Sequence, residues 1–203
     1  MKTRCVLITL AVILAMTALT GCDTDNNERQ RLVCEVAAVN NGAPLISAYL
    51  NSGNDKIVGT DDDFFPIDSV PVLFKARALN SQMVLPENGT YSWFHITSYD
   101  LVWHPGPTAP QELTNYNVTG GLVDAIVPVD DESVVSILVA DRSMKEQPWF
   151  RQLFDDFMDP NTPPSSFNAF LEITFYGHET SSEHQVAIPA GLAVNFYGAI
   201  FSN

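Results

Sequence analysis

Apolar and polar residues alternate along most of the chain from Leu32 onward, a period of two that is typical of strands with one buried face. In the segment 70–79, Lys75 and Arg77 fall on one face and apolar side chains fall on the other. Such alternation, or a high content of aromatic and β-branched residues, predicts strands over 32–39, 70–79, 91–103, 122–127, 133–140, 167–176 and 185–197. About seven strands separated by Asn-Gly, Gly-Gly and Asp-Asp turns predict a single all-β domain.

One segment departs from this period, because its large apolar residues recur at helical spacing. These residues are Trp149, Phe150, Leu153, Phe154, Phe157 and Met158. Pro148 suits the first position of a helix, and Asp159-Pro160 ends it. We expect an amphipathic crossover helix that packs its aromatic face on one end of the sheets, the alternative being a helix that docks a partner.

The N-terminus combines a basic stretch with an apolar run. Lys2 and Arg4 precede residues 6–19, which are almost all aliphatic, and the chain then becomes strongly polar. A membrane-spanning helix needs about 20 apolar residues, whereas this run has about 14. The pattern therefore predicts a cleaved export signal.

The end of this run, Leu19-Thr20-Gly21-Cys22, resembles the lipobox of bacterial lipoproteins. The resemblance implies that Leu19, Thr20 and Gly21 are recognised by the signal peptidase, and that Cys22 becomes the first residue and carries a diacylglyceryl anchor in the membrane. The chain then divides into a signal peptide (1–21), a lipidated cysteine with an acidic flexible tether (22–31) and one β-domain (32–203). We expect a lipoprotein of the bacterial cell envelope that faces the periplasm or the cell surface. The alternative is an ordinary secretory signal with an unrelated cysteine.

The chain is strongly acidic, with 10 basic and 24 acidic residues and a net charge of −14. Removal of residues 1–21 takes away Lys2 and Arg4 but no acid, which changes the net charge to −16. Such a surface repels phosphate backbones, so we expect no nucleic-acid partner. Cationic partners and divalent metals are compatible with it.

Lipidation and signal removal leave Cys34 as the single free thiol of the mature chain. No intramolecular disulfide can then form. Cys34 shares a face of its predicted strand with Leu32 and Val36, so we expect a buried, unreactive thiol. An intermolecular disulfide and cofactor attachment are the alternatives.

Segments 96–105, 171–179 and 193–196 resemble core strands of immunoglobulin-like domains in exported bacterial lipoproteins. The resemblance implies an immunoglobulin-like Greek-key sandwich. Trp93 or Trp103 would be its strand tryptophan, but Cys34 has no partner for the disulfide of antibody domains.

Two polar turns contain residue types that ligate metals. Imidazoles and carboxylates flank the predicted hairpin turn at 177–185, and such groups bind zinc or copper. The candidate ligands there are His178, Glu179, Glu183 and His184. The second turn carries Asp61, Asp62 and Asp63, whose oxygens suit calcium. Neither turn has metalloprotease or EF-hand spacing, which favours solvated turns over metal sites.

Motifs for catalysis are missing from the sequence, which contains no nucleophile elbow, phosphate-binding loop or dinucleotide-binding glycine motif. We predict a binding or assembly module without catalytic activity or cofactor, which is held in the membrane by lipid on Cys22 and contacts a protein partner in the envelope. Loops 61–66 and 105–111, the first with Phe64 and Phe65, are the expected recognition surfaces. The alternatives are a metal-binding protein or metal-dependent enzyme that uses His178 and His184, and a purely structural spacer.

Overall fold

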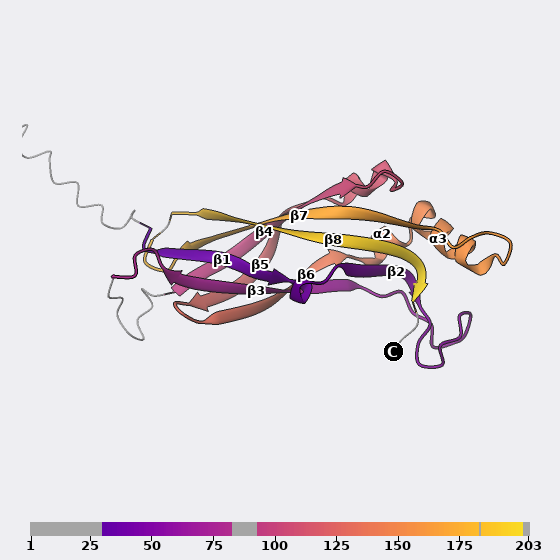
Figure 1. Cartoon of the computed structure of the whole chain (residues 1–203), viewed down its shortest axis with the longest axis horizontal. Coiled ribbons are helices and arrows are strands. Elements are labelled where there is room, and N and C mark those ends of the chain that lie inside the picture. The colour runs from indigo at the N-terminus through magenta and orange to yellow at the C-terminus, as the bar shows by residue number, and fades with distance from the viewer. Residues whose placement is uncertain (1–29, 83–92, 183, 201–203) are drawn as a thin grey trace, which may run out of the picture.

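The computed structural model describes residues 30–82, 93–182 and 184–200 of the chain. This described part forms two β-sheets connected by loops and short helices (Figure 1). Its strands are β1 (Leu32–Val39), β2 (Leu45–Asn51), β3 (Asp68–Ala78), β4 (Trp93–Pro105), β5 (Val118–Pro128), β6 (Glu132–Ala140), β7 (Ser166–Glu179) and β8 (Val186–Ile200). Its helices are η1 (Asn40–Gly42), η3 (Gln111–Tyr116), α2 (Arg142–Lys145) and α3 (Pro148–Met158). The predicted all-β character is confirmed, with one strand more than expected and a second α-helix, α2, before the predicted one.

The strands are ordered β1-β3-β6 in the smaller sheet and β2-β8-β7-β4-β5 in the larger one. Neighbouring strands run antiparallel except β2 and β8, which run parallel. The chain therefore passes from one sheet to the other between β1 and β2. η1 makes this passage with Asn40, Asn41 and Gly42 at φ angles of 50°, 55° and 80°. Asparagine and glycine adopt this left-handed backbone more readily than other residues.

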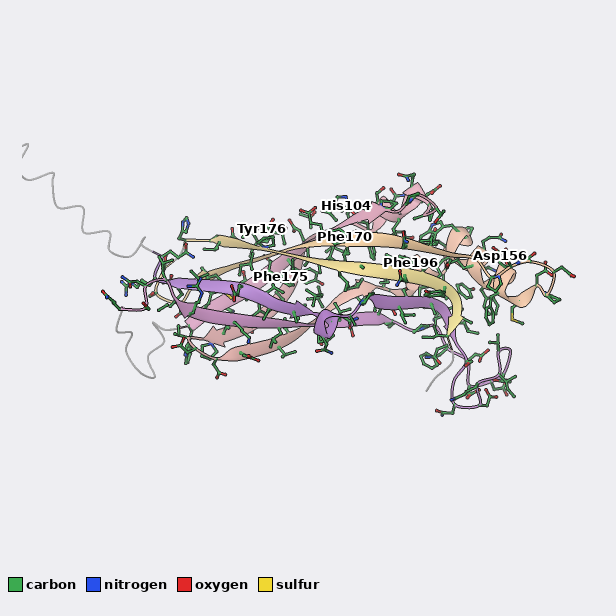
Figure 2. All side chains as sticks on the ribbon, viewed as in Figure 1. His104, Asp156, Phe170, Phe175, Tyr176 and Phe196 are labelled. Carbon is green, nitrogen blue, oxygen red and sulfur yellow. The ribbon has the colours of Figure 1, made fainter. Side chains whose placement is uncertain are left out.

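The core lies between the sheets and contains side chains from both. Phe74 of β3 and Phe175 of β7 are fully buried and meet edge to face, with ring centroids 4.9 Å apart (Phe175 is labelled in Figure 2). Trp103 and Phe196 make a second aromatic contact at 5.8 Å. Burial of each such side chain contributes about 1.5–3 kcal/mol. The Phe74–Phe175 contact joins the two sheets, whereas Trp103 and Phe196 both belong to the larger sheet and pack within its inner face.

The alternation predicted for 70–79 is confirmed in β3. Val72 and Phe74 are fully buried. Lys75, which follows Phe74 and faces the other side of the strand, is exposed and forms an ion pair with Glu132 of β6 at 2.6 Å. The period of two in the sequence therefore reports which face of β3 meets the core.

β2 has no such pattern, and no bounds were predicted for it. Ser47 and Ala48 are neighbours in the chain, yet both are fully buried. A strand in which two successive side chains are covered does not alternate, so a search for a period of two misses it.

α3 connects the two sheets and begins with Pro148 in its first turn, as predicted. Phe150 and Leu153 are buried on the side that faces β8. The two elements approach so closely that a Cβ atom on Gly198 would lie 2.2 Å from the Leu153 carbonyl oxygen. The predicted packing of the apolar helix face on the sheets is confirmed, while Met158 at the helix end is 48% exposed.

The two ends of the sandwich differ in their contacts. At the end where β1 begins, the Glu179 carboxylate accepts hydrogen bonds from the backbone N–H groups of Leu32, at 2.6 Å, and Arg31. The helices α2 and α3 lie at the opposite end (Figure 1). The chain thus enters the domain at one end and places its α-helices at the other.

Several predictions concern residues outside the described ranges. They include the lipobox positions Leu19, Thr20, Gly21 and Cys22, the tether up to residue 29, the predicted Asn-Gly turn at residues 88 and 89, and Glu183. In the described ranges, no helix is long and apolar enough to cross a membrane. The lipid anchor stays a prediction.

Candidate functional site

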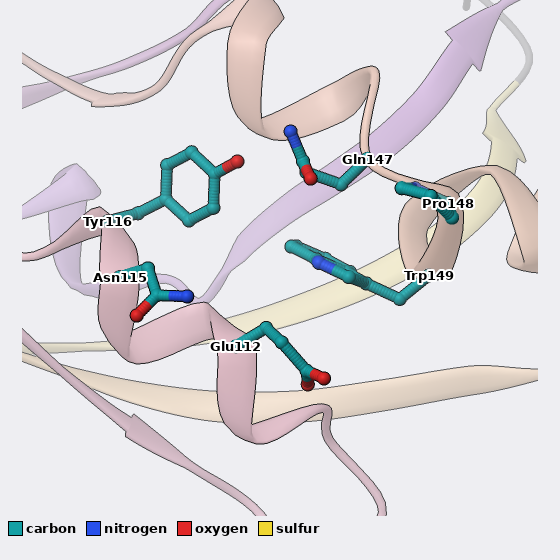
Figure 3. Close-up of a pocket in the computed structure, with 6 residues that line it drawn as sticks. All are labelled: Glu112, Asn115, Tyr116, Gln147, Pro148 and Trp149. Atoms are coloured by element: carbon teal, nitrogen blue, oxygen red, sulfur yellow. The ribbon is translucent and has the colours of Figure 1, made fainter.

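A hollow of about 380 Å³ opens between η3 and the turn that joins α2 to α3 (Figure 3). It lies at the helix end of the sandwich, opposite the start of β1 (Figure 1). Its lining residues are Glu112, Asn115, Tyr116, Gln147, Pro148 and Trp149. Two aromatic rings, two amides and one carboxylate make a lining typical of sites for small molecules that have both apolar and polar parts.

η3 is anchored by one side chain and presents its neighbours to the hollow. Leu113 is fully buried, whereas Glu112 and Asn115 on either side are exposed. Asn117 follows η3, and its side-chain oxygen accepts a hydrogen bond from the Trp103 backbone N–H of β4 at 2.8 Å. These contacts fix the wall of the hollow that η3 forms.

α2 is a single turn whose position depends on Lys145. The Lys145 side chain is fully buried; its Nζ lies 2.8 Å from Asp68 Oδ2 and donates a hydrogen bond to the Ala48 carbonyl at 2.7 Å. Ser47 donates to the same Asp68 oxygen at 2.6 Å. Burial lowers the pKa of Lys145, and the Asp68 carboxylate opposes this shift. Because Asp68 belongs to β3 and Ala48 to β2, Lys145 ties α2 and the adjacent Gln147 to both sheets.

Trp149 and Tyr116 form an aromatic corner. Their ring centroids are 6.4 Å apart and their planes meet at 72°. Behind this corner, Trp149 contacts Phe150 at 5.5 Å and Phe167 at 5.9 Å, and both phenylalanines are buried. Trp149 and Tyr116 are half-buried, so the core supports the rings while part of each faces the hollow.

Acidic groups dominate the surroundings of this corner. In the described part of the chain, no basic side chain forms an ion pair with Glu112. Burial raises the pKa of Tyr116, and the negative charge of Asp141 raises this pKa further. Arg142 is occupied by Glu146, with Nε 2.6 Å from the carboxylate oxygen. The hollow therefore combines an aromatic corner with a net negative environment.

The structure separates two of the predicted metal ligands. His178 and Glu179 are consecutive in β7, so their side chains face opposite sides of the sheet. Glu179 is 2% exposed. His178 lies on the outer side against His95, with ring centroids 5.5 Å apart, and His95 Nε2 is 2.7 Å from Asp124. His178 therefore has a histidine neighbour that lies on another strand.

In the described residues, no contact brings His184 to His178. His184 is exposed, and its backbone N–H donates to Ser182 Oγ at 3.1 Å. Glu183 lies outside the described ranges. Within those ranges, no group of three or more His, Cys, Asp or Glu side chains is arranged to hold a metal ion. The zinc hypothesis for this turn stays a prediction.

The predicted calcium ligands bind their own loop. Asp62 accepts hydrogen bonds from the Thr60 hydroxyl and the Asn54 backbone N–H, both at 2.7 Å, and these bonds lower its pKa. Asp63 accepts a backbone N–H of the same loop at 2.6 Å, and Asp61 is exposed. These carboxylates organise the turn, and calcium binding there stays a prediction.

The two loops predicted as recognition surfaces differ in how they pack. In the first, Phe65 meets Tyr49 edge to face at 5.0 Å and lies beneath the Arg142 guanidinium at 5.7 Å. Phe64 beside it is 50% exposed. The second loop, 105–111, leads directly into η3 and so borders the hollow.

The predicted burial of Cys34 is confirmed. Cys34 is 7% exposed and has no disulfide partner among the described residues. Burial raises the pKa of its thiol from 9.0 to about 12, and the Glu35 charge adds to this shift. The thiol is therefore protonated and covered at neutral pH.

The sequence did not predict the hollow as a site. Glu112, Asn115 and Tyr116 belong to a polar segment without a motif, and Trp149 belongs to the apolar stripe of a helix. The available signal is the run Gln147-Pro148-Trp149. A large aromatic residue in the first turn of a helix lies close to the end of that helix, where solvent can reach it.

Comparisons with known proteins do not assign a function to this site. No model of a protein family matches the chain. A search of curated proteins also gives no match. The hollow is therefore interpreted from its own residues and geometry.

Proposed function

We propose that this protein is a lipid-anchored binding module of the bacterial cell envelope, without catalytic activity, which recognises its partner at the helix end of the domain. One observation carries this proposal: the hollow lies opposite the start of β1. A chain that leaves the membrane at Cys22 would enter the domain at β1 and present the hollow away from the bilayer. The polar segment 23–31 spans up to about 30 Å when extended, which allows such a position.

We also infer that the two sheets form an immunoglobulin-like Greek-key sandwich. The strand order supports this inference. So does the placement of β1 in one sheet and β2 in the other, if the two together are counted as the first strand of such a domain. Trp103 is 2% exposed in β4, in keeping with the tryptophan of the third strand in such domains. Because sandwiches host many functions, the binding role rests on the hollow and not on the fold.

We favour binding over metal-dependent activity because two of the candidate carboxylates have backbone partners. Glu179 accepts the backbone N–H of Leu32, and Asp62 accepts that of Asn54. Carboxylates that already satisfy backbone donors are poorly available to a metal ion.

Fractionation of cells that produce the wild-type chain or the Cys22→Ser variant tests the anchor. The wild type is expected in the membrane fraction with an incorporated fatty-acid label, and Cys22→Ser in the aqueous fraction without it. Recovery of both proteins unlabelled in the aqueous fraction would contradict the anchor.

The binding role is tested by covalent cross-linking in intact envelopes. Trp149→Ala is expected to lose the products that the wild type forms. Glu35→Gln, at an exposed position of β1, is expected to keep them. Loss of no product in Trp149→Ala would contradict recognition at the hollow.

A further inference from the structure

The chemistry of the hollow points to a particular class of ligand. We propose that the aromatic corner of Trp149 and Tyr116, together with the Glu112 carboxylate, binds a small organic ammonium group, with methylated ammonium bound best. This inference deepens the proposed binding role and rests on the same hollow. The probe for this chemistry is the tetramethylammonium ion.

The geometry of the two rings suits a cation. A cation is attracted to the face of an aromatic ring when it lies within about 6 Å of the ring centroid. The centroids of Trp149 and Tyr116 are 6.4 Å apart, so one cation can satisfy this distance to both. The planes meet at 72°, which leaves a corner and not a flat platform. A sugar ring, in contrast, stacks best on a flat exposed face.

Charge favours the same ligand. The lining contains one carboxylate, Glu112, and no basic side chain. The adjacent basic residues are already engaged, Lys145 with Asp68 and Arg142 with Glu146. The whole chain has a net charge of −14, which raises the local concentration of cations.

A metal ion fits the hollow less well than an organic cation. Calcium takes about six to eight oxygen ligands. The lining offers one carboxylate and the amide oxygens of Asn115 and Gln147. The two rings, which occupy much of the wall, provide no oxygen for a metal apart from the Tyr116 hydroxyl. That hydroxyl lies 3.4 Å from the Ser143 carbonyl.

Fluorine NMR of the full-length protein, labelled with 5-fluorotryptophan and purified in a non-ionic detergent, tests the proposal. The chain has three tryptophans and gives three resonances, of which Trp149→Phe identifies one. Tetramethylammonium chloride is expected to shift the Trp149 resonance with saturation in the millimolar range. The other two resonances, which belong to Trp93 and to the buried Trp103, are expected to stay in place because neither residue lines the hollow.

Four controls separate cation recognition from its alternatives. The neutral alcohol 2,2-dimethylpropan-1-ol, in which carbon replaces the charged nitrogen of tetramethylammonium, is expected to need at least about tenfold higher concentration, and sodium chloride at equal ionic strength to give no saturable shift. Glu112→Gln is expected to weaken binding about tenfold, while the matched charge change Glu35→Gln leaves it unchanged.

Two results would overturn the proposal. Equal responses to tetramethylammonium and to the neutral alcohol would make the hollow a merely apolar site. A shift with N-acetylglucosamine but not with tetramethylammonium would make it a sugar site. Both results would leave the lipid anchor untouched, because the anchor is measured by fractionation, so failure of this inference is distinguishable from failure of the proposed function.

Discussion

Replacing Lys145 by methionine is expected to destabilise the domain by about 3–5 kcal/mol, because it leaves a buried carboxylate without its cation. The Lys145 and Asp68 side chains are 0% and 8% exposed, so water screens their interaction little. The substitution also removes the donor to the Ala48 carbonyl. Methionine keeps most of the length of lysine and its packing near Phe150, whose centroid lies 5.6 Å from Nζ. The loss is therefore mainly electrostatic.

Urea unfolding at pH 7, followed by circular dichroism, measures this loss in a double-mutant cycle. Lys145→Met and Asp68→Asn are each expected to lower the unfolding free energy by about 3–5 kcal/mol. The loss in the double variant is expected to be about 2 kcal/mol smaller than the sum of the two single losses. Lys75→Met removes an exposed ion pair on β3 and serves as the control with little change. A loss below about 1 kcal/mol in Lys145→Met, or additive losses in the double variant, would refute the role given to this pair.

Three further predictions follow from buried contacts elsewhere. Cys34 is expected to resist labelling by a maleimide at pH 7.5 until the protein is unfolded, as measured by peptide mass spectrometry. Because burial raises the pKa of this thiol from 9.0 to about 12, the thiol of the unfolded chain ionises first, and the stability that the buried thiol contributes is lost as pH rises from 9.0 towards 12. Cys34→Ala should therefore reduce the fall of the unfolding free energy over this pH range. Labelling of the native protein at pH 7.5 would contradict this burial. Gly198→Ala is expected to lower the free energy of urea unfolding by about 1–3 kcal/mol, since its Cβ would press on the Leu153 carbonyl oxygen. In the control Gly191→Ala, the new Cβ would meet the half-exposed ring of Phe170, which can move, so the loss should be smaller. A larger loss in Gly191→Ala than in Gly198→Ala would exclude this explanation. Glu179→Leu is expected to lower the unfolding free energy by about 1–3 kcal/mol, because it leaves the Leu32 N–H without an acceptor. Glu179→Gln keeps an acceptor and should lower it less. Equal losses in the two variants would argue against a stabilising role of this hydrogen bond.

Strand pattern and helix punctuation are the features that the sequence predicted best. β3 alternates because one face meets the core and the other meets water. Phe74 on the first face is buried, and Lys75 on the second is exposed. The start of α3 is predictable because Pro148 fits a first turn, where no backbone donor is needed. Local chemistry decides both features, so a single sequence is enough to reveal them.

Contacts between distant segments could not be predicted. The hollow joins Tyr116 of η3 to Trp149 of α3, and no motif links these positions in the sequence. The arrangement of the histidine turn could not be predicted for a related reason: β7 extends to Glu179, beyond the predicted end at 176, and this extra length places His178 and Glu179 on opposite faces. Lys145 also gave no signal, because a lysine in a polar segment is usually exposed.

Site-specific photo-cross-linking in living cells tests whether the helix end of the domain contacts a partner. A photoreactive amino acid would replace Pro148 at the rim of the hollow in one lipid-anchored chain and Asp130, in the turn between β5 and β6 at the opposite end, in another. Recognition at the helix end predicts discrete cross-linked products from position 148, their loss when Trp149→Ala is added, and none of these products from position 130. The same products from both positions, or products from position 130 alone, would contradict recognition at the helix end.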